Sequence, residues 1–559
     1  MTGYLRPLLP GRDDYAQLSR TWRGDLLAGL TVGIVALPLA LAFGVSSGVS
    51  AEAGLITAIV AGLVAAIFGG SHIQVSGPTG AMVVVLAPIV AQHGVGAVAT
   101  VSLLAGLIVL TTGLLKLGRL ITVIPWPVIE GFTLGIAIII FLQQVPAAVG
   151  VTDFHGQDHS TNALVAAIQS LALADPATLW WSLACALAVA CIMVGFQLWR
   201  EQFPGSIVAI IVVALAVWGL GRTGSAVPVA LIGELPASLP APSIPALDGP
   251  MVVALLGPAL AVAALAAIES LLSARVAAGL ADTGAYNADR ELVGQGLASI
   301  ASGLFGGMPA TGAIARTAVN VRSGGRTRLA SITHALVLLA VVYLAASVVS
   351  QIPLAALAGV LMVTAVRMVS FRTARTVVSA SRADAVIFLV TAGITVAFDL
   401  IIAVIVGVVC AAVIALRALA RSGTAVREPL PGEPVEGDEH IALFRLDGAM
   451  FFLAAESVVA AVEQVRDVEV VIVRMSMLGE LDATGARAIT EMVQGLERRG
   501  VTVLLKGIQE RHLPLARRVG VLASLRHERH LFDDLGAAIT HARDHVRRAR
   551  EAPRAPHSP

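Results

Sequence analysis

Two glycine-rich segments that share the same order of residues are the strongest candidates for a functional site. Residues 68–70 read Phe-Gly-Gly and are followed by Gly-Pro-Thr-Gly-Ala at 77–81, while residues 305–307 repeat Phe-Gly-Gly and are followed by Thr-Gly-Ala-Ile at 311–314. Each segment lies in an apolar part of the chain and opens a run too short to cross a bilayer. Such backbone is tolerated at membrane depth only where protein buries it or it lines a cavity. Two interrupted segments at corresponding positions indicate the binding site of a transporter.

Each of these segments is expected to begin a short helix, and the two helix starts are expected to face each other. A helix start presents free N–H groups and about half a positive charge, so two facing starts form a site for an anion. The hydroxyl groups of Thr79 and Thr311 would either bind the substrate or only cap the helices, and the sequence leaves both roles open. Glycine lets a substrate approach the backbone. The expected substrate-binding residues are Thr79, Gly80, Ala81, Thr311, Gly312, Ala313 and Arg316.

Glu269 lies deep inside a long apolar run and is the expected binding residue for a coupling ion. An ionised carboxylate at the bilayer centre costs about 2.5–3.5 kcal/mol on insertion scales, and intramembrane acids usually mark ion paths. Ser273 follows four residues later on the same side of a helix and is expected to share the site. Arg316 lies one turn beyond Gly312, where it would either add positive charge beside an anion or form an ion pair with Glu269.

No other pattern predicts catalysis, a metal site or a cofactor. The three cysteines fall inside apolar runs, without the spacing of a disulfide or metal site. No nucleotide-phosphate loop, ATPase signature or catalytic triad spacing occurs, so we expect neither an enzyme nor a nucleic-acid partner. Thr484 is a candidate for regulatory phosphorylation, although capping of a helix by Asp482 or Thr484 is the simpler interpretation.

The elements that must position these residues are membrane-spanning helices. Of the 559 residues, 57% are hydrophobic and 13% charged, which is typical of a protein that crosses a bilayer many times. The segments that begin at Thr79 and Thr311 are the third and tenth of fourteen expected spans. Because an offset of seven is odd, the second half enters the membrane in the opposite orientation, as an inverted repeat. The expected spans are 25–46, 51–68, 79–90, 98–115, 128–145, 179–198, 207–220, 252–274, 292–305, 311–321, 329–349, 354–366, 383–398 and 400–418.

The positive charges predict the orientation of these spans. Arginine and lysine collect in the loops on one side, which is therefore expected to be cytoplasmic, whereas the opposite loops hold only Arg222. Both termini then lie in the cytoplasm. The loop at 147–176, which carries Asp153 and Asp158, is expected outside.

Changes in composition divide the chain into five parts. Residues 1–24 form a polar cytoplasmic arm, 25–421 the membrane domain, 422–440 a linker rich in Pro, Gly and acids, 441–547 a soluble α/β domain and 548–559 a disordered basic tail. Within the α/β domain, the patterns predict strands at 468–473 and 501–505 and helices at 483–498, 514–519 and 531–546.

Several motifs together give a resemblance to a known family. The chain resembles the sulfate permease family of anion transporters in Ala-Leu-Pro-Leu-Ala-Leu-Ala-Phe-Gly at 36–44, Gly-Pro-Thr-Gly at 77–80, Glu-Leu-Val-Gly-Gln-Gly at 291–296, Phe-Gly-Gly at 305–307, the run 311–321 with Asn320, and 482–485. The resemblance spans essentially the whole chain. It implies a seven-plus-seven inverted repeat with core and gate domains, a carboxy-terminal STAS domain and a homodimer. Family substrates include sulfate, bicarbonate, chloride and dicarboxylates.

One difference bears on the coupling ion. The sodium-bicarbonate branch that many segments resemble is implied to hold sodium with an Asp and a hydroxyl residue, and Glu269 and Ile314 stand at those positions. We therefore expect a proton-coupled symporter of small anions with an elevator-type mechanism, in a bacterial inner membrane. A sodium-coupled bicarbonate symporter, or an exchanger or channel of the same fold, is the alternative. A membrane enzyme or scaffold is disfavoured, since the membrane half offers only Glu269 and Arg316.

Overall fold

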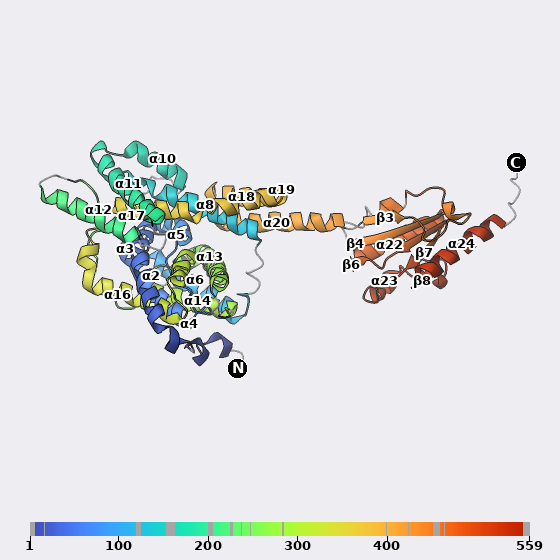
Figure 1. Ribbon diagram of the computed structural model, residues 1–559, viewed down its shortest axis with the longest axis horizontal. Coiled ribbons are helices and arrows are strands. Elements are labelled where there is room, and N and C mark those ends of the chain that lie inside the picture. The colour runs from blue at the N-terminus through green and yellow to red at the C-terminus, as the bar shows by residue number, and fades with distance from the viewer. Residues whose placement is uncertain are drawn as a thin grey trace. The chain divides into compact units, whose positions relative to one another are not determined.

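The computed structural model describes residues 6–15, 17–118, 125–151, 162–199, 205–223, 227–235, 238–245, 248–281, 284, 286–397, 400–422, 424–450, 459–462 and 464–551. The chain divides into two compact units, residues 1–408 and 409–559. The first is helical and the second is built on a β-sheet (Figure 1).

Long apolar helices build the first unit, and in the described part of the chain nine are long and apolar enough to cross a membrane. Several expected spans are shorter, as interrupted helices should be. The helices are α2 (Leu18–Ser46), α3 (Ala51–Ile56), the π-helical turn η3 (Thr57–Ala61), α4 (Gly62–Phe68), α5 (Gly80–His93), α6 (Ala97–Leu114), α8 (Trp126–Gln143), α9 (Val145–Ala148), α10 (Ala163–Leu173), α11 (Pro176–Trp199), α12 (Gly205–Arg222), α13 (Gly249–Leu280), α14 (Ala288–Leu304), α15 (Ile314–Arg322), α16 (Arg328–Val349), α17 (Leu354–Met368), α18 (Phe371–Ala380), α19 (Arg382–Ala397) and α20 (Leu400–Ser422).

The packing of these helices repeats between the two halves of the membrane domain. Helix α6, the fourth span of the first half, packs on α13 and α14, the first two spans of the second half. Its counterpart α16 packs in the same way on α2 and α4 of the first half. This exchange of partners is what an inverted repeat produces. A separate set of contacts joins α8, α11, α12, α17 and α19, which we call the gate group. The core group is made of α2, α3, α4, α5, α6, α13, α14, α15 and α16.

Small residues let the core helices approach closely. A Cβ atom on Gly44 would lie 2.1 Å from the Ser50 carbonyl oxygen, and one on Gly54 would lie 2.0 Å from the Ala40 carbonyl oxygen. Helices in a bilayer associate through such contacts, because lipid offers no hydrophobic driving force between them. Helices α2 and α3 therefore pack backbone to backbone.

The two interrupted segments meet in a short antiparallel pairing at the centre of the core. Strand β1 (Ser76–Gly77) pairs with β2 (Thr311–Gly312), with Ser76 opposite Gly312 and Gly77 opposite Thr311. The pairing satisfies backbone groups that would otherwise be unpaired at membrane depth. It also corrects one expectation, because α15 begins at Ile314 rather than at Thr311, with Ala313 as its N-cap.

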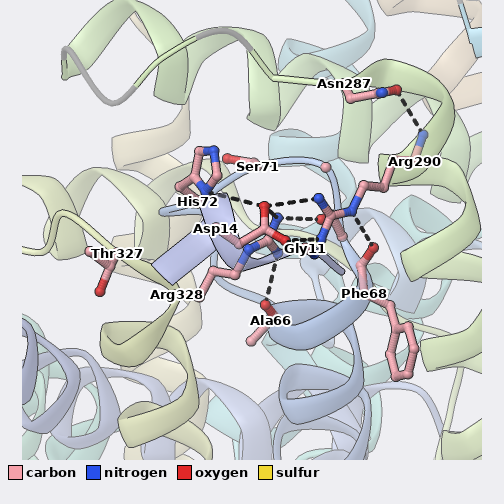
Figure 2. A network of polar contacts seen from close by, with 12 residues as sticks. Gly11, Asp14, Ala66, Phe68, Ser71, His72, Asn287, Arg290, Thr327 and Arg328 are labelled. Atoms are coloured by element: carbon pink, nitrogen blue, oxygen red, sulfur yellow. Dashed lines mark hydrogen bonds and ion pairs between the residues drawn. The ribbon is translucent and has the colours of Figure 1, made fainter. Parts of the chain in front are cut away.

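The amino-terminal segment is anchored to the core by a polar network (Figure 2). Asp14, in the 3-10 turn η2 (Arg12–Tyr15), receives hydrogen bonds from Arg290 Nη1 at 2.9 Å and Nη2 at 2.7 Å, and Arg328 Nη2 lies 3.4 Å away. His72 Nδ1 lies 3.9 Å from Asp14. Burial opposes ionisation of Asp14, but the hydrogen bonds from Arg290 and the Gly11 N–H, with the charge of Arg328, lower its pKa to about 2. Within the expected arm at 1–24, the described residues 6–15 therefore dock on α14 and α16, and the residues from Leu18 onward belong to α2.

The segment at 147–176, expected as an external loop, contains the apolar helix α10. Its side chains include exposed Ile168 and Leu171, so the acidic residues alone gave an incomplete interpretation. Asp153 and Asp158 lie outside the described residues.

The second unit is an α/β sandwich. Its sheet order is β3-β4-β5-β7-β8, in which only β3 and β4 pair antiparallel, and β6 pairs with β4. Helices α22 and α23 cover one face and α24 the other, because alternate residues of each strand point to opposite faces. The elements are β3 (Thr424–Glu428), η4 (Asp438–His440), β4 (Ile441–Met450), β5 (Val470–Arg474), β6 (Leu478–Leu481), α22 (Ala483–Arg498), β7 (Thr502–Lys506), α23 (Leu513–Val519), η5 (Glu528–His530), β8 (Leu531–Phe532) and α24 (Leu535–Glu551).

Two domain boundaries differ from the expectation. The expected linker at 422–440 contains strand β3. Composition did not reveal this strand, because β3 is held by pairing with β4, which lies further along the chain. The expected disordered tail begins at 548, but α24 continues to Glu551. The rest of that tail, 552–559, lies outside the described residues.

Candidate anion and coupling-ion site

Glu269 bonds to both interrupted segments at once. Its Oε2 atom accepts a hydrogen bond of 2.8 Å from Thr79 Oγ1 and another of 2.8 Å from Thr311 Oγ1. The two threonine oxygens are themselves 3.2 Å apart. One carboxylate oxygen on α13 therefore joins residues that are 232 positions apart in the chain, one from each half of the repeat. On the sequence alone, Thr79 and Thr311 are assigned to substrate binding and Glu269 to the coupling ion, and the structure places the three side chains in contact.

The Thr79 hydroxyl is not used for capping. Thr79 is the N-cap residue of α5, yet its side chain makes no capping hydrogen bond and bonds to Glu269 instead. The N-terminal N–H groups of α5 and α15 therefore remain without a side-chain cap, since Ala313 has none to offer. Gly80 is packed by the neighbouring helix α8, because a Cβ there would lie 2.2 Å from Ile140 Cδ1. Ala81 and Ala313 are both buried.

Ser270, the neighbour of Glu269 on α13, contacts β2. The Gly312 N–H donates to Ser270 Oγ at 3.0 Å, whereas the buried Ser273 hydroxyl has no hydrogen-bond partner among the described residues. The i, i+4 spacing predicts that Ser273 shares the coupling-ion site of Glu269, and this role stays a prediction.

Arg316 lies behind β1 and is almost fully buried. Its Nη2 donates to the Pro78 carbonyl oxygen, while Nη1 has no hydrogen-bond partner among the described residues. A Cβ on Gly77, whose φ is +151°, would lie 2.7 Å from that Nη1 atom, so only glycine lets the guanidinium approach the strand. The alternative role as an ion-pair partner is not realised, since no described salt bridge joins Arg316 to Glu269.

Gln74 lies at the candidate site, although it was not singled out from the sequence. Its buried side-chain amide lies against Gly312, where a Cβ on that glycine would be 1.7 Å from Gln74 Nε2. Neither Nε2 nor Oε1 of Gln74 has a hydrogen-bond partner among the described residues. An unpaired buried amide is costly, so Gln74 supplies one free donor and one free acceptor beside β2. The only signal in the sequence was a polar residue four positions before Pro78.

Glu291 and Gln295 hold the loop that leads into β1. Glu291 Oε2 accepts hydrogen bonds from the N–H groups of Gly70 at 2.8 Å and Ser71 at 3.1 Å. Gln295 Nε2 donates to Glu291 Oε1 at 2.8 Å and to Ser76 Oγ at 2.6 Å. The Glu-Leu-Val-Gly-Gln-Gly motif on α14 therefore positions the first interrupted segment.

Glu269 also lines a cavity between the core group and the gate group. The cavity is bordered by α8, α13 and α17 and by the first residue of α15, and Thr133 is a second polar residue in its wall. A carboxylate at this boundary is accessible from the space between the two groups. The lining residues are Val128, Ile129, Phe132, Thr133, Ile136, Ile268, Glu269, Leu272, Ile314 and Met368.

The regulatory candidate lies in the second unit. Asp482 Oδ1 accepts a hydrogen bond of 2.7 Å from the Gly485 N–H and so caps α22, while Thr484 is exposed in the first turn. Phosphorylation of Thr484 remains a prediction. Among the described residues, no group of three or more His, Cys, Asp or Glu side chains is placed to hold a metal ion.

Comparisons with known proteins agree with this architecture. Residues 22–391 match the sulfate permease family and residues 434–538 match the STAS domain. A putative sulfate transporter of Bacillus subtilis, YvdB, is 31% identical over 91% of this chain and 96% of its own length. The bicarbonate transporter BicA of Synechocystis is 31% identical over 87% of this chain and 88% of its own length.

Solved structures show the same fold. The transmembrane domain of a cyanobacterial BicA is 34% identical, covers 69% of this chain and 98% of that chain, and superposes with a TM-score of 0.62. Murine Slc26a9, an anion transporter in the inward-facing state, covers 97% of this chain and 95% of its own with a TM-score of 0.82, although only 18% of residues are identical. These relatives are transporters rather than enzymes.

Proposed function

We propose that this chain, which belongs to the sulfate permease family of anion transporters, is a secondary active transporter that carries a small anion together with a proton. The single observation that carries the proposal is the hydrogen bonding of Glu269 to Thr79 and Thr311. The anion belongs to the sulfate, bicarbonate or dicarboxylate class, since the relatives include proteins named as sulfate and bicarbonate transporters.

The substrate site lies at the starts of α5 and α15. Uncapped N–H groups and the helix dipoles favour negative charge there, and the charge of Arg316 behind β1 adds to the attraction. Gln74 offers a donor and an acceptor to an oxyanion that reaches β2. The wall of this site beside the two helix starts is formed by Thr79, Gly80, Ala81, Thr311, Gly312 and Ala313.

Proton coupling follows from the number of hydrogens that the threonines can donate. Each hydroxyl has one hydrogen, which serves either the Glu269 carboxylate or the substrate anion, but not both. A neutral carboxyl group is a weaker hydrogen-bond acceptor than a carboxylate, so protonation of Glu269 frees the two hydroxyls to donate to the anion. The anion in turn favours the neutral acid, because two negative charges repel at short distance. Proton and anion therefore load together and leave together.

In this proposal, alternating access takes place at the boundary between the core group and the gate group, where the cavity lies. We propose that the core group, which carries the whole site, moves past the gate group as an elevator, because Glu269 faces α8 and α17 across that boundary. The closely packed contacts of α2 with α3 favour movement of the core as one body. The protein is further proposed to work as a homodimer in a bacterial inner membrane, with both termini and the STAS domain in the cytoplasm.

A sodium-coupled bicarbonate symporter is the second candidate. Three oxygens, one from each of Glu269, Thr79 and Thr311, lie within 3.2 Å of one another and are the hard ligands that such a cation prefers. The relatives named as bicarbonate transporters also favour it.

Uptake of labelled sulfate, bicarbonate and dicarboxylates into proteoliposomes, under an imposed proton or sodium gradient, tests the two candidates. Glu269→Gln mimics the neutral acid, so anion exchange should persist while accumulation driven by a pH gradient is lost. Glu130→Gln is the matched control, because among the described residues the Glu130 carboxylate bonds only to the exposed Trp126 indole, and it does not line the cavity at Glu269. Full pH-driven accumulation in Glu269→Gln, or wild-type uptake that follows sodium alone, would refute proton coupling.

The topology has its own test. A single cysteine at Asp482 or Thr484 in a cysteine-free variant should react with an impermeant thiol reagent only in inside-out vesicles. Reaction from the periplasmic side of whole cells would contradict a cytoplasmic STAS domain.

A further inference from the structure

Four histidines of the second unit lie together where η5 and β8 meet α24. The ring centroid of His530 is 5.5 Å from that of His527, 5.5 Å from that of His541 and 6.3 Å from that of His545. His541 and His545 are 6.2 Å apart and lie one turn apart on α24. His530 is the centre of this histidine cluster and is only 2% exposed.

The cluster contains imidazole nitrogens that no acceptor or donor satisfies. His530 Nδ1 and His541 Nε2 are buried and have no hydrogen-bond partner among the described residues. A neutral imidazole tolerates this better than an imidazolium, which carries two N–H donors and a charge. The packing therefore selects neutral histidines.

The charged groups around the cluster also disfavour protonation. The described charges that face it are Arg526 before η5, Arg548 on α24 and Glu497 on α22. Glu497 is the single acid among them, and its Oε2 is already 3.0 Å from Arg526 Nε. Burial lowers the pKa of His530 to about 4, with further lowering from the neighbouring histidines and Arg526. Burial and the charge of Arg548 also lower the pKa of His545.

We propose that the histidine cluster is a proton sensor, which holds η5 and β8 against α24 while its rings are neutral and releases them when the rings are protonated. Because the folded-state pKa of His530 is below its usual 6.5, the closed contact is fully stable above about pH 6.5 and loses stability as the pH falls toward 4. This inference is independent of the transported anion and of the coupling ion.

The structure confines the opening to one edge of the sheet. Strand β8 is joined to β7 at only two positions, Leu531 opposite Leu505 and Phe532 opposite Lys506. Helix α24 has other attachments, namely buried Ile539 and Val546 on the sheet and an ion pair of Arg543 with Asp438 at 2.8 Å. Protonation should therefore loosen 526–532 while α24 stays docked.

Hydrogen–deuterium exchange of the full-length protein in detergent, corrected for intrinsic pH dependence, tests the sensor. From pH 7.5 to pH 5.5 the exchange of peptides covering 526–532 should rise about tenfold, which is the factor that a shift from 6.5 to 4 gives for one histidine. Peptides from the middle of α24 should change much less. Equal exchange of 526–532 at both pH values would overturn the proposal.

Two variants separate protonation from general destabilisation. His530→Phe keeps an aromatic ring that cannot titrate, so the rise between pH 7.5 and 5.5 should fall below about threefold. His512→Gln is the matched control, because His512 is a buried histidine of the same unit outside the cluster, and it should keep the tenfold rise. A full rise in His530→Phe would refute the sensor. Loss of protection at pH 7.5 on adding EDTA would also refute it and make the cluster a metal site.

Discussion

Replacement of Asp14 by Asn tests the anchor of the amino-terminal segment. The change keeps the shape of the side chain but removes the charge between Arg290 and Arg328 (Figure 2). A pKa lowered from 3.8 to about 2 corresponds to about 2 kcal/mol of folding free energy at neutral pH. Leaving two buried guanidinium groups without their carboxylate adds to this loss, since breaking a buried ion pair costs about 3–5 kcal/mol in total. We therefore expect Asp14→Asn to destabilise the protein by about 2–4 kcal/mol.

The assay is unfolding of the purified protein in detergent, followed in a double-mutant cycle. Asp14→Asn, Arg290→Gln and the double variant should show a coupling energy of about 1–3 kcal/mol. Asp384→Asn is the control, because in the described part of the chain the Asp384 carboxylate bonds only to Ser381 at an exposed helix start, and it should cost about 1 kcal/mol or less. A coupling energy of zero would show that Asp14 and Arg290 act independently and would refute the anchor.

The same contact predicts a pH dependence with a definite sign. The pKa of Asp14 is lowered in the folded protein, so its contribution is present above about pH 4 and is lost as the pH falls toward 2. Between pH 7 and pH 3 the wild type should lose about 1 kcal/mol more than Asp14→Asn. An equal loss in both proteins would contradict the lowered pKa.

Three further predictions concern the site and the second unit. Gly312→Val should abolish anion binding in an isothermal titration while folding is retained, because a side chain at 312 meets Gln74 Nε2. Adding Gln74→Ala should restore part of the affinity, and unchanged binding in Gly312→Val would place the site elsewhere. Thr79→Val and Thr311→Val each remove a donor to Glu269 and should lower pH-driven uptake about tenfold or more, while the serine variants keep most of it; equal activity of the valine and serine variants would contradict the coupling scheme. Deletion of everything after Glu428 should change rate, folding or trafficking but not the order of substrate preference, and an altered order in uptake assays would place the second unit in the permeation path.

The sequence predicted the parts of the site that carry a local signal. Gly and Pro in short apolar runs indicated both interrupted segments, because a bilayer tolerates irregular backbone only where protein buries it or it lines a cavity. A carboxylate in a long apolar run indicated Glu269, because intramembrane acids are costly and usually mark ion paths. The start of the second short helix, α15, was expected at Thr311 but lies three residues later, at Ile314. Pairing of Thr311–Gly312 with Ser76–Gly77 decides that start, and the pairing joins segments too far apart for local propensity to reveal.

Contacts between distant residues were missed for the same reason. Gln74 approaches Gly312 only because β1 and β2 are adjacent. Asp14 meets Arg290 and Arg328 across separations of 276 and 314 residues, so the first 24 residues appeared to be a free polar arm. Ser270 bonds to the Gly312 N–H because β2 lies beside α13, which is also a contact between distant residues.

The distances between the three site oxygens bear on the choice between proton and sodium. A cation held by oxygens at about 2.4 Å, as in calcium sites, separates neighbouring octahedral ligands by about 3.4 Å. The Thr79 and Thr311 hydroxyl oxygens each lie 2.8 Å from Glu269 Oε2 and 3.2 Å from each other, so the single hydrogen of each hydroxyl is donated to the carboxylate at hydrogen-bond length. A sodium ion would have to spread these oxygens and turn both hydroxyl hydrogens away from Glu269, whereas a proton binds to the carboxylate without requiring the oxygens to move apart. The two hydroxyls that leave the neutral acid then have the uncapped start of α5 and Gln74 beside them, which is where an oxyanion would bind.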